Sequence, residues 1–173
     1  KTNDRGKLIM ACGTGKTYTS LKIAENEVKP TGLVLFLVPS IALLGQTLDE
    51  WTAHATKPIR PMCVCSDAAV SKKQKANDDG GFTVEDLAFP AVTNTDEIIR
   101  QFRELDLMAK TNKGFRVVFS TYQSLPQVIK AQKELNREKP HQADFDLVIC
   151  DEAHRTTGAA AKDEKQSAFI LVH

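Results

Sequence analysis

The sequence reads Leu8-Ile9-Met10-Ala11-Cys12-Gly13-Thr14-Gly15-Lys16-Thr17 near its start, an apolar run followed by a glycine-rich turn. Apolar residues then recur at Leu21, Ala24 and Val28, the spacing of one helix face. The pattern therefore predicts a turn that leads from a strand into a helix. The two glycines permit backbone conformations closed to other residues and a close approach to a phosphate. Main-chain N–H groups at the start of the helix would point at that anion.

The residues after the turn fit triphosphate chemistry. Lys16 would reach the outer phosphates as a point charge, and the Thr17 hydroxyl would ligate Mg²⁺. Cys12, Gly13, Thr14 and Gly15 complete the expected phosphate-binding turn. The full pattern G-x-x-x-x-G-K-[ST] requires glycine at position 10, where this chain has Met10, so the pattern's first glycine is missing. The alternative is an ordinary glycine-rich turn, which a lysine and a threonine at this offset disfavour.

An acidic pair follows the run Phe145-Asp146-Leu147-Val148-Ile149-Cys150. Such an apolar run predicts a strand buried on both faces of a parallel sheet, and ligands bind at the carboxyl ends of these strands. Asp151 is the candidate to hold Mg²⁺ through water, and Glu152 is the candidate general base that orients an attacking water. The alternative is a solvated acidic turn.

Strand and helix signals alternate along the chain, which predicts an α/β fold with a three-layer arrangement: a parallel sheet with helices on both faces. The expected strands cover 8–11, 33–38, 61–65, 116–119 and 145–150. Helices are expected after Gly15, after Ser40 as N-cap, after Asn94 as N-cap, and near Ser124 with Pro126 in the first turn. The segment 68–90 lacks apolar periodicity, so we expect a mobile surface loop there.

Composition places limits on the function. A chain of 173 residues fits one domain, and 23 basic against 22 acidic residues leave a net charge of +1. Bulk charge therefore gives no support to nucleic-acid binding. The four cysteines lack C-x-x-C spacing, so we expect reduced thiols rather than a zinc site or a disulfide framework. The longest apolar stretch, 33–38, is too short to span a membrane, and we expect a cytoplasmic protein.

Several segments resemble superfamily-two helicases and translocases. Ala11 to Thr17 is similar to helicase motif I, and Asp151-Glu152-Ala153-His154 matches the DEAH form of motif II. Between them, Val38-Pro39-Ser40 through Gln46 resembles motif Ia, and Ser120 to Leu125 resembles the motif near Ib. The resemblance covers essentially the whole chain, and the string Cys150 to Gly158 is closest to the motors of type I, type III and type ISP restriction enzymes.

The resemblance implies a RecA-like P-loop NTPase domain that uses ATP and Mg²⁺ and moves on DNA. It implies nucleic-acid contacts at Pro39, Ser40, Gln46, Thr121 and Ser124, and a role for His154 in coupling hydrolysis to DNA. Motif III and an adenine-recognising glutamine are not found in the sequence. Residues 1–173 are therefore expected to be the first lobe, nearly inactive alone, with a second RecA-like lobe and a fused nuclease or methyltransferase domain in the same polypeptide.

Three alternatives stay open at this stage. An RNA helicase is disfavoured because Pro39-Ser40-Ile41-Ala42 differs from the Pro-Thr-Arg-Glu-Leu form of DEAD-box proteins. A P-loop kinase or switch would leave the acidic pair incidental and would show no coupling to nucleic acid. A non-catalytic nucleotide-binding module is the third.

Overall fold

The computed structural model describes residues 6–65, 91–92, 94–111 and 113–153. Its strands form one parallel sheet in the order β3-β2-β4-β1-β5. The strands are β1 (Leu33–Val38), β2 (Ile59–Val64), β3 (Ala91–Val92), β4 (Phe115–Thr121) and β5 (Leu147–Cys150). The helices are α1 (Lys16–Glu27), α2 (Ile41–His54), α3 (Thr95–Thr111) and α4 (Leu125–Glu138), with the short 3₁₀ helix η4 (Tyr122–Ser124) between β4 and α4.

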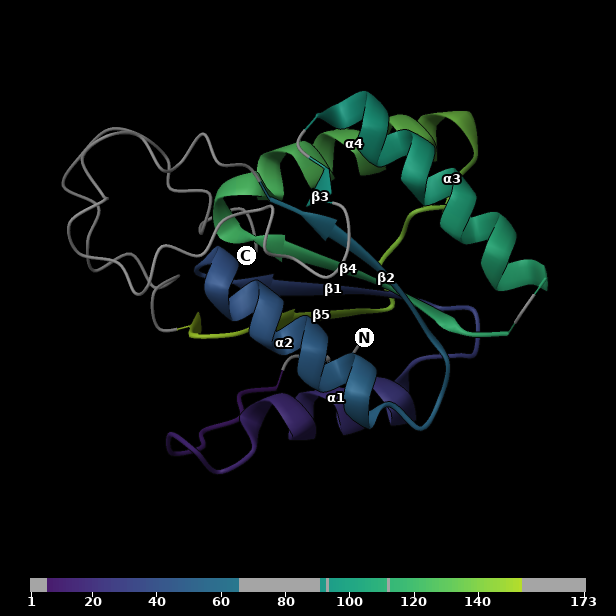
Figure 1. Cartoon of the computed structure of the whole chain (residues 1–173). Coiled ribbons are helices and arrows are strands. Elements are labelled where there is room, and N and C mark those ends of the chain that lie inside the picture. Colours follow the sequence, from purple (N-terminus) through teal and green to yellow (C-terminus); the bar gives the residue numbers. More distant parts are fainter. Residues whose placement is uncertain (1–5, 66–90, 93, 112, 154–173) are drawn as a thin grey trace, which may run out of the picture.

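Helices cover both faces of the sheet, with α1 and α2 on one side and α3 and α4 on the other (Figure 1). The interior strand β1 is buried along its whole length. Leu33, Leu35 and Leu37 pack into the cluster under α3 and α4, and the alternate residues Val34 and Phe36 pack into the cluster under α1 and α2. Successive side chains of a strand point to opposite faces, so a run apolar at every position requires two covered faces. The predicted three-layer α/β fold is confirmed.

The helix starts follow the predicted capping residues. The Ser40 hydroxyl accepts a hydrogen bond from the Leu43 N–H at 3.3 Å, and the Asn94 side chain accepts one from the Glu97 N–H at 2.8 Å. Such bonds satisfy N–H groups that have no partner within the helix. Pro126 lies in the first turn of α4, where its missing N–H costs no helical hydrogen bond.

The prediction of a strand at 8–11 was wrong. This segment forms no strand, and the Leu8 and Ile9 side chains are 57% and 82% exposed. A strand needs a neighbour to pair with, and among the described residues no strand of the sheet pairs with this segment. A short apolar run does not by itself provide that pairing.

The predicted two-sided burial of the strand before Asp151 was also wrong. The strand starts at Leu147 rather than Phe145, and Val148 is 43% exposed. Among the described residues β5 pairs with β1 alone, so it is an edge strand of this sheet. Its apolar composition is that of an interior strand, whereas its position leaves one edge open.

Two predictions fall on parts of the chain that the structure does not describe. The expected loop at 68–90 and the expected coupling residue His154 both lie outside the described residues. The short strand β3, which pairs with the end of β2, was not predicted. Within the described ranges no helix is long and apolar enough to cross a membrane.

Candidate nucleotide-binding site

The glycine-rich turn leads directly into α1. Gly13 and Gly15 have φ angles of +75° and +84°, in the left-handed region that costs other residues about 1–2 kcal/mol. The Thr14 N–H and hydroxyl both donate to the Ala11 carbonyl, which closes the turn. Gly15 occupies the N-cap of α1 and has no side chain to cap it. The first N–H groups of the helix are therefore available to an anion.

The acidic pair is held by its main chain. The Asp151 N–H donates to the Leu37 carbonyl at 2.9 Å, and the Asp151 carbonyl accepts a hydrogen bond from the Tyr122 hydroxyl at 2.8 Å. The Glu152 N–H donates to the Asp151 side chain at 3.0 Å. Glu152 has φ of +51°, an unfavourable conformation for a residue with a side chain. These surrounding hydrogen bonds stabilise a turn that local preference disfavours.

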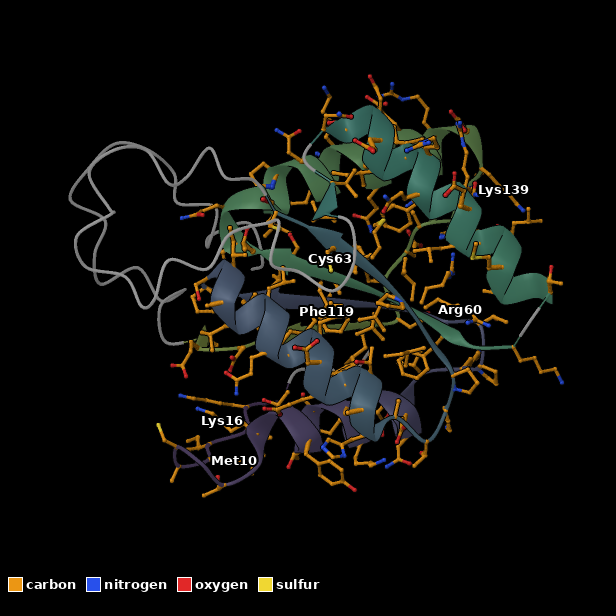
Figure 2. The ribbon with its side chains drawn as sticks, in the orientation of Figure 1. Met10, Lys16, Arg60, Cys63, Phe119 and Lys139 are labelled. Carbon is orange, nitrogen blue, oxygen red and sulfur yellow. The ribbon has the colours of Figure 1, made fainter. Side chains whose placement is uncertain are left out.

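The structure brings the glycine-rich turn and the acidic pair together. Lys16 Nζ donates to Glu152 Oε1 at 3.2 Å, although the two residues are 136 positions apart. Their side chains are 36% and 30% exposed, so the pair faces solvent on one side. The hydrogen bond and the charge of Glu152 raise the pKa of Lys16, which keeps the ammonium charged. Lys16 lies beside the glycine-rich turn at the start of α1 (Figure 2).

The donor set fits Mg²⁺ bound together with a phosphate. Burial, with a contribution from the charge of Glu152, raises the pKa of Asp151, and a nearby cation would favour its charged form. The described part of the chain contains no cluster of three or more His, Cys, Asp or Glu side chains that could enclose a metal. Mg²⁺ needs no such cluster, since it keeps several waters and is commonly held by one or two protein groups and substrate phosphates.

The segments predicted to contact nucleic acid follow neighbouring strands. Pro39 and Ser40 follow β1, Thr121 ends β4, and Val38 lies opposite Thr121 in the parallel register. Carboxyl ends of parallel strands lie at one edge of a sheet. Asp151, directly after β5, lies at the same edge.

Some of the predicted side chains are already bonded within the protein. Thr121 and Ser124 are 2% and 5% exposed, and the Thr121 hydroxyl donates to that of Ser124. Ser40 caps α2, and Gln46 is exposed and donates to Glu50. Gln123 is the exposed residue of the 3₁₀ turn, and it was not among the predicted residues.

Two further polar residues were not predicted. The Tyr122 ring is 1% exposed, and its hydroxyl bonds to the acidic pair. Glu25 is 3% exposed and accepts hydrogen bonds from the loop after α2. The sequence contains one signal for Glu25, because it follows Leu21 by four residues and so lies on the apolar face of α1.

A groove at the far end of the sheet is separate from this site. It is lined by the end of α2, the start of β2 including Arg60, and Leu105 and Met108 of α3. Arg60 therefore belongs to the amino ends of the strands, and Figure 2 shows it far from Lys16. The glycine-rich turn and the acidic pair of the candidate nucleotide site meet at an open surface instead.

A parallel sheet with a glycine-rich turn before one helix and an acidic pair after an apolar strand is the arrangement of a RecA-like helicase domain. The family described as "Type III restriction enzyme, res subunit" matches residues 1–172. The chain belongs to this family.

Solved structures and curated relatives agree with this assignment. The chain is 42% identical to the Type ISP restriction-modification enzyme LlaGI, solved as a nuclease-deletion mutant with a DNA substrate mimic, with a TM-score of 0.72 over 100% of this chain. It is 39% identical to the ATP-dependent Type ISP enzyme LlaBIII bound to DNA, with a TM-score of 0.77 over 99% of this chain. "Probable helicase A859L" of African swine fever virus (isolate Pig/Kenya/KEN-50/1950) is 30% identical over 154 residues, or 89% of this chain.

The chain spans a small part of these proteins. It covers 12% of the LlaGI chain, 10% of the LlaBIII chain and 14% of the viral protein.

Proposed function

We propose that this chain is the ATP-binding lobe of an ATP-dependent DNA translocase or helicase, the motor of a restriction-type enzyme. The observation that carries the proposal is the contact between Lys16 and Glu152, which joins the phosphate-binding turn to the acidic pair at the carboxyl edge of the sheet. The similarity to enzymes described as ATP-dependent and bound to DNA supports the choice of DNA.

Each residue of the site has a proposed role in hydrolysis. Lys16 and the N–H groups at the start of α1 bind the outer phosphates of ATP, and Cys12 to Gly15 form the turn around them. Glu152 positions a water and accepts its proton. Thr17 and Asp151 are the residues that would hold Mg²⁺, which neutralises charge on the phosphates when it is bound.

The exposure of the site supports a two-lobe arrangement. Residues 11–15 are exposed, and Lys16 and Glu152 remain about one third exposed. Phosphoryl transfer depends on positioning and on excluded water, which one open surface does not provide. We propose that a second RecA-like lobe closes over the nucleotide, and that the same polypeptide has a nuclease or methyltransferase region. The size of the relatives supports both proposals.

The proposed DNA-binding surface lies at the same edge as the acidic pair. Pro39, Ser40 and Gln46 would contact one stretch of backbone, and the turn from Thr121 to Ser124 another. Main-chain N–H groups at helix starts bind phosphates without reading bases, which suits a motor that moves over any sequence. His154 is proposed to couple this surface to hydrolysis.

ATP hydrolysis by a polypeptide extended through the second lobe tests the proposal. We expect duplex DNA to stimulate hydrolysis, and single-stranded RNA to stimulate it much less. The 173-residue chain alone should hydrolyse ATP slowly, because we propose that the second lobe supplies an arginine finger, and the loss of such a finger costs about 10³–10⁵ in rate. Hydrolysis that no nucleic acid changes would favour a kinase, a switch or a simple binding module, and stimulation by RNA alone would favour an RNA helicase.

A further inference from the structure

The Tyr122 hydroxyl connects two parts of the site that are far apart in the chain. Tyr122 begins the 3₁₀ turn η4, which also contains Ser124 and directly follows Thr121. Its ring is buried in the cluster under α3 and α4, and its hydroxyl donates to the Asp151 carbonyl at 2.8 Å. The Cys150 thiol lies within hydrogen-bonding reach of the same hydroxyl.

This hydrogen bond acts on the peptide unit between Asp151 and Glu152. The carbonyl of that unit accepts from Tyr122, and its N–H donates to the Asp151 side chain. Both ends of the peptide plane are therefore held, and the chain continues from it into the left-handed conformation of Glu152. Because a residue with a side chain disfavours this conformation, contacts outside the turn are needed to maintain it.

The hydroxyl is suited to this task in a second way. A tyrosine hydroxyl has an ordinary pKa of about 10, so it is protonated at neutral pH and can donate this hydrogen bond. The other tyrosine, Tyr18, is 51% exposed on α1, and its hydroxyl has no hydrogen-bond partner among the described residues.

We propose that Tyr122 is a positioning residue that holds the Glu152 carboxylate in place and transmits movement of the 121–124 turn to it. The inference rests on the proposed function, since that turn is the proposed DNA contact and Glu152 the proposed base. When DNA shifts the turn, the Tyr122 hydroxyl moves with it. The peptide before Glu152 then follows, because the partly buried Asp151 carbonyl would otherwise lose its partner.

The test is Tyr122→Phe in the full-length protein, with Tyr18→Phe as the matched control. Both changes remove one hydroxyl and keep the ring. For Tyr122→Phe we expect the DNA-stimulated kcat to fall about tenfold, the effect of losing one hydrogen bond to a partly buried carbonyl. The KM for ATP and the Kd for nucleotide should change less than about twofold, because Lys16 and the turn before it are untouched. Tyr18→Phe should leave all three quantities unchanged.

Two measurements keep the result independent of stability. Single-turnover hydrolysis of bound ATP counts the molecules that are folded and loaded. In a Glu152→Gln background, Tyr122→Phe should cause no further loss, since both changes act on one group. An unchanged kcat for Tyr122→Phe, or fully additive losses with Glu152→Gln, would overturn this inference and leave the proposed function in place. A wild-type protein that DNA does not stimulate would overturn the proposed function and this inference with it.

Discussion

Lys16 Nζ and Glu152 Oε1 lie 3.2 Å apart in this structure, although 136 positions separate the two residues. The contact exists because α1 begins beside the carboxyl end of β5, where the acidic pair is located. It joins a cation that can bind phosphate to a carboxylate that can accept a proton from water. The role that this contact implies for each residue of the site can be tested by substituting one residue at a time.

Lys16→Ala is expected to weaken ATP binding by about ten- to a hundredfold, because hydrogen bonds to charged groups contribute about 1.5–3 kcal/mol. Titration with a fluorescent ATP analogue measures the effect. Lys130→Ala is the matched control, since Lys130 is exposed on α4, on the opposite face of the sheet. Equal affinities for the two variants would contradict the assignment of Lys16 to the phosphates.

Glu152→Gln should lower the DNA-stimulated kcat of the full-length protein by about 10²–10⁴ while ATP still binds. An amide cannot accept the proton of the attacking water, but it occupies the same space. Glu104→Gln, an exposed change on α3, should leave kcat unchanged. The measurement is steady-state hydrolysis beside nucleotide affinity, and a fully active Glu152→Gln protein would remove this residue from the mechanism.

Gly15→Ala should reduce ATP affinity through the backbone. A Cβ at Gly15 would meet no atom within 4 Å, but the φ of +84° disfavours any residue with a side chain by about 1–2 kcal/mol. Gly6→Ala is the matched control, because it has equal space and no positive φ. Calorimetric titration with ATP compares the two, and we expect a loss of about five- to thirtyfold for Gly15→Ala alone. A loss of the same size in both proteins would rule out the backbone explanation.

Glu25 should stabilise the fold in a pH-dependent way. Burial would raise the pKa of its carboxyl, but hydrogen bonds from Lys22, Thr56 and Lys57 outweigh burial and lower this pKa from 4.5 to about 2. The stabilisation is therefore present above pH 4.5 and is lost as the pH falls through 2. At pH 7 it amounts to about 3 kcal/mol.

Chemical unfolding of Glu25→Gln checks this prediction. The free energy of unfolding should fall by about 3 kcal/mol at pH 7, and the difference from the wild type should shrink as the pH falls from 4.5 towards 2. Glu27→Gln, at an exposed position of the same helix, should change stability by less than about 0.5 kcal/mol. A difference that is constant with pH would show that packing, rather than charge, makes Glu25 stabilising.

Local pattern was enough to predict much of the fold. The strand at 33–38 was predicted with the bounds of β1, and Ser40, Asn94 and Pro126 marked helix starts where the structure has them. Periodicity and capping depend on residues a few positions apart, so they are visible in the sequence. The roles of Lys16 and Glu152 also come from residue type and spacing, and they stay predictions.

The tertiary structure decided which residues meet. The runs at 8–11 and 145–150 are similarly apolar, yet only the second contributes a strand, and that strand lies at an edge. Pairing depends on neighbours distant in the chain, and the sequence alone does not name them. The sequence alone also does not predict the hydrogen bond from Tyr122 to Asp151 or the one from Thr56 to Glu25. Both depend on the close approach of elements about 30 residues apart. The sequence by itself determined the elements and the chemical groups at their ends, and the packing of those elements decided which groups act together.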